Sequence, residues 1–178
     1  MIFKFTLLSD ESNKFLRVID IDSEATFFDL HKAILKACGY KDDQMTSFFI
    51  CDSQWNKQTE ITLEAMDEDS TVESYVMKNT LLSQFCESKK QRLLYEFDPL
   101  SGRDFFIELT NILYKKDIKE TVCSRSEGDA PEQTRDPDFL SSSVDEDDSF
   151  NDISEYEDEE LDGLTITDGI PFKDDDLL

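Results

Sequence analysis

Apolar and polar residues alternate through the first part of the chain and predict a hairpin of two strands. Residues 2–7 are apolar except for Lys4 and Thr6, and the same alternation returns at residues 15–22. A period of two is the pattern of a strand with one buried face. Residues 9–13, which are Ser, Asp, Glu, Ser and Asn, separate the two stretches with a composition typical of a turn.

The period then changes to that of a helix between Thr26 and Gly39. Thr26 is a suitable N-cap, and Asp29 three residues later is placed to complete a capping box. Gly39 suits the left-handed conformation that ends many helices. The apolar residues at helical spacing are Phe27, Leu30, Ile34 and Ala37.

The segments after this helix predict further strands, one short helix and a second hairpin. They are a strand at residues 45–51, a returning strand at 60–63, a short helix at 81–86 capped by Thr80, and strands at 91–98 and 103–113 joined by the turn 99–102. This order predicts an α+β fold with a mostly antiparallel sheet, one main helix and a C-terminal β-hairpin. Its ββαβ opening is β-grasp-like, which is a comparison of fold and not of function.

Charge divides the chain into two regions. Acidic residues outnumber basic ones 42 to 18, which gives a net charge of −24. Residues 1–123 hold 22 acidic and 15 basic residues, whereas residues 124–178 hold 20 and 3. We therefore expect an α+β domain at 1–123 and an acidic, largely disordered tail at 124–178, because the tail's scattered apolar residues cannot offset its ordering entropy. A chain this acidic is not expected to bind nucleic acid directly or to dock on an anionic membrane.

The sequence also predicts a cytoplasmic protein. It has no run of 18 apolar residues, and its apolar start is too short for the core of a signal peptide. The four cysteines are Cys38, Cys51, Cys86 and Cys123, and their spacing fits no zinc or redox motif. In a reducing cytoplasm we expect them to remain thiols.

Few residues suit a catalytic or cofactor site. His31 is the single histidine, and the sequence has no glycine-rich phosphate loop or nucleophile motif, so we expect no cofactor. We interpret His31 as a structural residue, with a general base as the alternative. Glu96 and Asp98 lie two positions apart on a predicted strand and are expected on one face, where they could bind Mg²⁺ or act as acid and base. The alternative is a solvated strand face.

Three parts of the chain carry a family signature. Thr26–Tyr40 begins Thr-Phe-Phe-Asp-Leu-His and ends Gly-Tyr, Leu94–Asp98 and Ile107–Leu109 form two later strands, and Cys123 is followed by Gly128–Glu132. These segments resemble the plasmid pRiA4b ORF-3-like family, which is also described as an insertion-element passenger, resolvase-like or TnpR family. Its helix signature is Thr-Leu-x-Asp-Leu-His, and its later stretch is Cys-x-x-Gly-x-x-Ala-x-Pro-Pro-Glu.

The resemblance covers residues 1–132 and implies a fold more than an activity, since the family's function is largely unknown. Two departures remove side chains that could form a site. Residues 99–106 replace the family's Phe-Gly-Asp-x-Trp-x-His, and residues 45–47 lack the histidine of its His-x-Phe. The recombinase chemistry implied by the resolvase name needs a nucleophile among several arginines, and the five arginines here are far apart in the sequence.

Three functions remain open at this point. The first is a non-enzymatic interaction or regulatory protein that uses the sheet face and the acidic tail. Its protein partner is unknown, and a partner with a basic surface would suit the acidic tail. The second is a mobile-element accessory protein that acts on nucleic acid indirectly or mimics it through its acidity. The third is a carboxylate-metal enzyme built around Glu96 and Asp98.

The tail carries apolar residues that can act as partner-binding anchors, namely Phe150, Ile153, Tyr156 and Leu161. The first three are spaced by three and fall near one face of a helix. A basic surface would neutralise the carboxylates around them and allow that helix to form.

We expect binding by the tail to weaken as salt rises, and also when Phe150, Ile153 and Tyr156 are changed together to Ser. Calorimetric titration of the tail peptide against its captured partner at two salt concentrations measures both effects. An affinity that changes neither with salt nor with the three substitutions would show that the tail only keeps the protein soluble.

Overall fold

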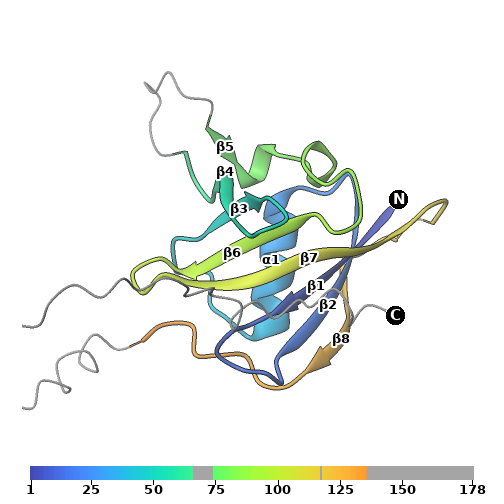
Figure 1. Ribbon diagram of the computed structural model, residues 1–178. Helices are drawn as coiled ribbons and strands as arrows, with labels where there is room; N and C mark the ends of the chain where they lie inside the picture. Colours follow the sequence, from blue (N-terminus) through green and yellow to red (C-terminus); the bar gives the residue numbers. More distant parts are fainter. Residues whose placement is uncertain (66–73, 117, 136–178) are drawn as a thin grey trace, which may run out of the picture.

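An eight-stranded sheet with one helix across a face forms the fold (Figure 1). The computed structural model describes residues 1–65, 74–116 and 118–135. The strands are β1 (Ile2–Leu8), β2 (Leu16–Asp22), β3 (Ser47–Cys51), β4 (Lys57–Thr62), β5 (Tyr75–Val76), β6 (Arg92–Asp98), β7 (Arg103–Leu113) and β8 (Val122–Glu127). The helix is α1 (Phe27–Cys38), and two single 3₁₀ turns are η1 (Met77–Asn79) and η2 (Leu82–Gln84). The sheet order is β5-β4-β3-β6-β7-β1-β2-β8.

The α+β class and the mostly antiparallel sheet predicted from the sequence are confirmed, since every named pair of strands is antiparallel except β4 with β5. Along the chain β1, β2, α1 and β3 follow the predicted ββαβ order, but in the sheet the hairpin β6–β7 lies between β3 and β1. The predicted short helix is the turn η2. Within the described residues, no helix has the length and apolar character needed to cross a membrane.

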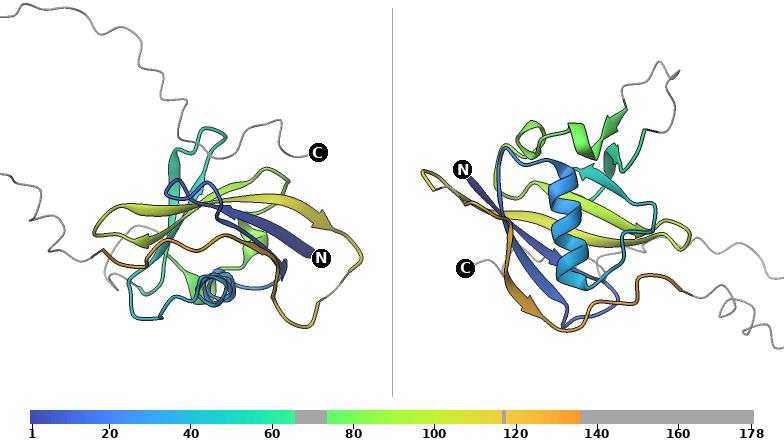
Figure 2. Two further views of the ribbon diagram at one scale, coloured as in Figure 1. Left: turned by 90° about the horizontal axis from the view of Figure 1, so that it is seen from below. Right: turned by 180° about the vertical axis from the view of Figure 1, so that it is seen from behind.

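Helix α1 begins and ends where the local signals predict, and it lies against one face of the sheet (Figure 2). The Asp29 amide donates to the Thr26 hydroxyl at 3.2 Å, and the Thr26 amide donates to the Asp29 carboxylate at 2.9 Å. Gly39 ends the helix at φ +70°, a conformation that suits glycine. The Arg17 guanidinium donates to the Ala37 carbonyl at 3.0 Å, so β2 supplies a positive charge to the negative end of the helix.

Aromatic side chains fill the space between α1 and the sheet. Phe15 and Phe97 both stack on Phe105, with ring centroids 4.9 and 4.5 Å apart. Phe27 of α1 meets Phe48 of β3 edge to face at 5.3 Å. Full burial of such a side chain contributes about 1.5–3 kcal/mol. The largest fully buried residues include Tyr95, Phe5, Phe15, Phe27, Phe48, Phe97 and Phe105.

Strand β8 carries the chain past residue 123 as the last strand of the sheet. All six of its residues are exposed, so it is held by backbone pairing with β2 and not by a buried face. Arg17 adds a hydrogen bond to the Glu127 carbonyl at 2.6 Å. Gly128 follows at φ +63°, where a Cβ atom would lie 2.3 Å from the Lys14 carbonyl oxygen. Any other residue would force the two backbones apart.

Residues 128–135, here called the strap, cross the C-terminal end of α1. The Tyr40 hydroxyl donates to the Pro131 carbonyl at 2.5 Å. The Gln133 side chain accepts from the Lys41 amide at 2.8 Å and donates to the Lys41 carbonyl at 2.7 Å. A side-chain amide thus pairs with one backbone unit as a neighbouring strand would.

The domain boundary expected at residue 123 therefore falls inside β8, and contacts with the body of the protein continue to Arg135. Backbone pairing explains the difference, because β8 continues beyond Cys123 as Ser, Arg, Ser and Glu, which give no apolar pattern to the sequence. Residues 136–178 lie outside the described residues. They include the predicted anchors Phe150, Ile153, Tyr156 and Leu161.

We expect a fragment ending at residue 135 to be more stable than one ending at residue 123. The shorter fragment loses most of β8, the bond from Arg17 to the Glu127 carbonyl and the contacts of the strap, and each hydrogen bond contributes about 0.5–1.5 kcal/mol. Urea unfolding followed by circular dichroism should place the midpoint of the longer fragment clearly higher. Equal midpoints would show that β8 and the strap do not stabilise the sheet.

Candidate functional site

Glu96 and Asp98, the candidate metal ligands, do not form a pair in the structure. A bulge in β6 places an extra residue between them relative to β7, which breaks the alternation on which the prediction rested. Glu96 contacts the Lys57 ammonium at 3.3 Å, whereas Asp98 contacts the Arg103 guanidinium at 3.3 Å. Within the described residues, no group of three or more His, Cys, Asp or Glu is arranged to hold a metal ion.

His31 is packed between α1 and the sheet. Its Nδ1 lies 2.8 Å from the Tyr95 hydroxyl, and its Nε2 lies 3.3 Å from an Asp42 carboxylate oxygen. Only 1% of the residue is exposed. This burial lowers the pKa of His31, and the Asp42 carboxylate opposes the effect. Because both ring nitrogens have partners and the ring is buried, His31 links the helix to β6 and is not presented to a substrate.

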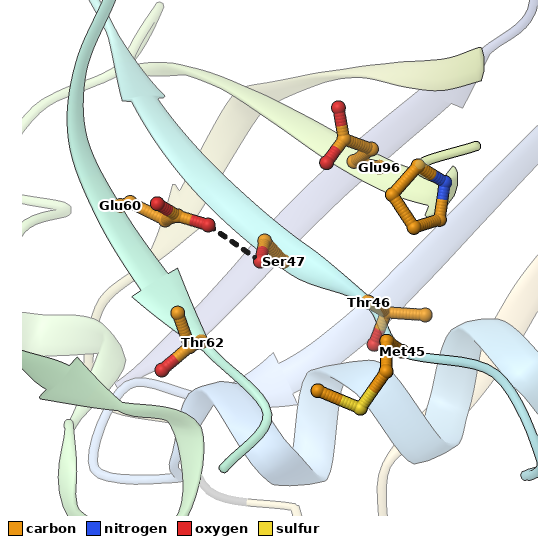
Figure 3. A pocket seen from close by; sticks show the side chains of 7 residues that line it. Met45, Thr46, Ser47, Glu60, Thr62 and Glu96 are labelled. Carbon is orange, nitrogen blue, oxygen red and sulfur yellow. Dashed lines mark hydrogen bonds between the residues drawn. The ribbon is translucent and has the colours of Figure 1, made fainter. Parts of the chain in front are cut away.

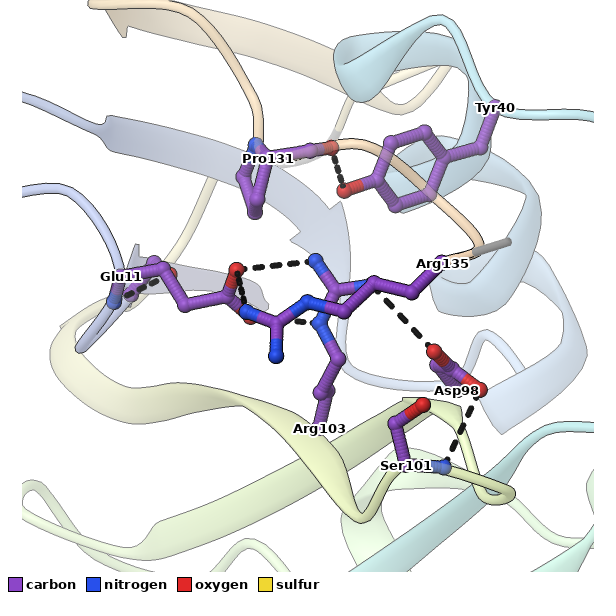
Figure 4. Close-up of polar contacts among 8 residues, drawn as sticks. Glu11, Tyr40, Asp98, Ser101, Arg103, Pro131 and Arg135 are labelled. Atoms are coloured by element: carbon purple, nitrogen blue, oxygen red, sulfur yellow. Dashed lines mark hydrogen bonds and ion pairs between the residues drawn. The ribbon is translucent and has the colours of Figure 1, made fainter. Parts of the chain in front are cut away.

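Arg103 forms the most connected ion-pair group of the described residues (Figure 4). Its guanidinium makes two hydrogen bonds to Glu11, at 2.7 and 2.9 Å, and one to Asp98 at 3.3 Å. Arg135 at the end of the strap contacts the same Glu11 carboxylate at 3.3 Å. The bond to Arg103 lowers the pKa of Glu11. This group joins the β1–β2 turn, the β6–β7 turn and the strap, so its role is structural.

A small cavity opens at the ends of β3, β4 and β6 (Figure 3). Its volume is about 170 Å³. Ser47 lies opposite Glu96 on one side and opposite Thr62 on the other, and its hydroxyl donates to Glu60 at 2.8 Å. We call this space the acidic cavity. Its lining residues are Met45, Thr46, Ser47, Glu60, Thr62, Glu96 and Pro99.

Negative charge exceeds positive charge around the acidic cavity. Asp104 lies opposite Glu96 on β7, and the Lys57 ammonium contacts both carboxylates, at 3.3 and 3.6 Å. The pKa of Asp104 is raised to about 6, chiefly by burial, and the Glu96 charge adds to this increase while Lys57 opposes it. The second carboxylate oxygen of Asp104 is buried and has no hydrogen-bond partner. Lys57 is therefore divided between two carboxylates, and the Glu60 carboxylate accepts from the Ser47 hydroxyl instead.

A second cavity, of about 280 Å³, lies where β6 begins, beside the β3–β4 turn. Its rim carries Lys89, Lys90 and Arg92 against a single carboxylate, Asp52. We call it the basic cavity. Such a concentration of cations is unusual in a chain with a net charge of −24.

Trp55, the only tryptophan in the sequence, lies beside the basic cavity. Its ring packs edge to face on Phe106 at 5.0 Å, and the Arg92 guanidinium lies 5.1 Å from the ring centroid. Arg92 also pairs with the buried Glu108 at 3.2 Å. Trp55 has φ +67°, a conformation that bulky residues rarely adopt. Packing on this face of the sheet offsets that strain. Hydropathy did not reveal this site, because the lone tryptophan falls in a polar turn.

Comparison with known proteins gives a fold and a family. The crystal structure of a protein of unknown function, MM3350 from Methanosarcina mazei Go1, matches with a TM-score of 0.54 and 22% identity. The match covers 70% of this chain and 68% of that chain, and at this identity it shows the fold alone. No curated protein matches.

The residues that carried the resemblance in the sequence have structural roles. Thr26 and Asp29 cap α1, His31 bonds to Tyr95, and Gly128 begins the strap. A model of the plasmid pRiA4b ORF-3-like protein family matches residues 2–138, more than half of the chain. The chain therefore belongs to the plasmid pRiA4b ORF-3-like protein family.

Proposed function

We propose that the protein is a non-enzymatic binding module that takes a basic peptide segment of a partner protein at the acidic cavity. One observation carries the proposal: the carboxylates of Glu60 and Glu96 line an open cavity, while the nearby Lys57 ammonium is divided between Glu96 and Asp104 and Glu60 accepts from the Ser47 hydroxyl. A lysine or arginine side chain of a partner would supply the missing positive charge.

The shape and lining of the acidic cavity suit such a side chain. Met45 is 53% exposed and Pro99 lies at the rim, so both offer apolar surface to a methylene stem. Lysine and arginine place their stems on apolar surface while the charged head stays in a polar setting. An ionised carboxylate accepts several hydrogen bonds, so Glu60 and Glu96 can keep their present contacts and accept another donor.

The geometry favours binding over catalysis. The acidic and basic cavities, of about 170 and 280 Å³, are each smaller than the 300–1,000 Å³ that is typical of small-molecule sites. His31 is buried with both ring nitrogens engaged, and the third function considered, a metal enzyme, loses support because Glu96 and Asp98 contact different cations. No feature of the described residues favours the mobile-element role over the binding module.

We further propose a cytoplasmic location, and the state of the cysteines supports it. All four are thiols. Burial raises the pKa of Cys38 and Cys86 to about 12 and that of Cys51 to about 11. Such thiols stay protonated and unreactive, as a reducing compartment favours.

A labelled peptide of alternating lysine and glycine, titrated against the full chain, tests the proposed binding. We expect Glu60→Gln with Glu96→Gln to weaken binding about tenfold at physiological salt, since two exposed ion pairs contribute roughly 0.5–1 kcal/mol each. The matched control is Glu24→Gln with Glu120→Gln, two exposed residues whose substitution changes the net charge equally. Fluorescence anisotropy measures each affinity. An equal loss in both variants would mean that net charge, and not the cavity, attracts the peptide.

The burial of the Asp104 carboxylate can also be measured as stability. Because the pKa of Asp104 is about 6 in the fold and near 3.9 in an unfolded chain, folding favours its protonated form. The carboxylate therefore costs stability as pH rises from about 4 to 6, and the full cost persists above pH 6. We expect Asp104→Asn to raise the melting temperature by about 2–4 °C at pH 8. The difference from the unmodified protein should vanish near pH 4, and a difference that stays constant with pH would contradict this account.

A further inference from the structure

We propose that the basic cavity binds the acidic segment 136–178 of the same chain, so that the protein holds its own tail against its sheet. The observation behind this proposal is that positive and negative side chains gather toward opposite ends of β6. Lys89, Lys90 and Arg92 gather at the start of β6, while the carboxylates of the acidic cavity lie toward the other end. This inference concerns different residues from the proposed function and does not depend on it.

The rim of the basic cavity is held firmly by the backbone. The Lys90 amide donates to the Leu109 carbonyl at 2.8 Å, and the Leu109 amide donates to the Gln91 carbonyl at 2.9 Å. Lys90 itself has φ +71°. This turn fixes Lys89 and Lys90, both exposed, beside Arg92. Cations on a fixed turn bind carboxylates at less cost in entropy than cations on a loose loop.

Trp55 lies next to these charges, and 8% of it is exposed. Its ring lies under the Arg92 guanidinium and on Phe106. A segment that alternates carboxylates with aromatic residues can therefore place its acids on Lys89 and Lys90 and a ring near Trp55. The chain's own acidic segment has that composition, with Phe150 and Tyr156 among its acid blocks.

Charge explains why the occupant is this segment and not a separate acidic protein. Residues 136–178 contain 17 acidic residues and one basic residue. A separate acidic protein would meet the repulsion of a chain with net charge −24 before it reached the cavity. A segment joined to the domain is present at an effective concentration on the order of millimolar and needs no encounter from solution.

The connecting chain is long enough to reach. The described residues end at Arg135, which contacts Glu11 near the β6–β7 turn (Figure 4). The basic cavity lies at the opposite end of β6, which spans about 20 Å at 3.3 Å per residue. Residues 136–144 can extend about 30 Å. The first acid block, residues 145–148, can therefore lie at the lysines.

Zero-length carbodiimide crosslinking of the full chain tests the contact, because it joins a lysine to a carboxylate only when they touch. We expect Lys89 and Lys90 to be joined to carboxylates within residues 145–160, and Lys115 and Lys116 to serve as the exposed reference pair. Crosslinks to the reference pair should be several times rarer, and those to Lys89 and Lys90 should fall in 1 M salt. In an equal mixture of ¹⁵N-labelled and unlabelled protein, the crosslinks should join only peptides of the same label.

Trp55 gives a second measurement. Acrylamide quenching of its fluorescence should at least double when Lys89→Glu and Lys90→Glu release the segment, and should not change with the control Lys115→Glu and Lys116→Glu. Both variants change the net charge equally. Crosslinks that favour neither lysine pair, crosslinks between differently labelled copies, or equal quenching in both variants would overturn the proposal. Neither readout involves Glu60 or Glu96, so the two proposals can fail separately.

Discussion

A helix of 12 residues covers one face of an eight-stranded sheet and is too short to cover the whole of it. The rest of the structure depends on this difference in size. The helix is about 18 Å long, whereas seven strand spacings measure about 34 Å. The residues that cover what α1 leaves open come from the turns η1 and η2 on one side and from the strap on the other. They include Met77, Leu82, Cys86 and Ala130. Aromatic rings such as Phe15 and Phe105 fill the remaining depth.

Within residues 1–65, 74–116 and 118–135, no helix lies on the opposite face of the sheet. Polar residues cover part of that face instead. Trp55 folds back from a turn onto Phe106 and Leu94, while the strands around it carry ion pairs in which Arg92 and Lys57 are the cations. Both cavities lie among these strands. Their opposite charges give one sheet two surfaces with different binding preferences, which a layer of helices would have hidden.

Local signals in the sequence predicted the elements that local interactions determine. The capping residues Thr26 and Asp29 fixed the start of α1 because their bonds join neighbours three residues apart. Contacts between residues far apart in the sequence could not be predicted. Glu11 and Arg103 pair across 92 positions, and no sequence pattern marks either as a partner of the other. The bulge beside Asp98 depends on the pairing of β6 with β7, so the Glu96–Asp98 pair could not be tested without the structure. Strand β8, which buries no side chain, left no hydropathy signal.

Strand β7 is the one link between the two halves of the described sheet, since β1, β2 and β8 lie on one side of it and β6, β3, β4 and β5 lie on the other. Ile2 pairs with Leu113, so β1, which has β2 on one edge, gains a partner on its other edge only after β7 has been translated. At about 5–20 residues per second, that delay lasts roughly 5–20 s. During this time Phe3 and Phe5 have β2 beside them but not β7, so part of the apolar surface of the hairpin stays uncovered.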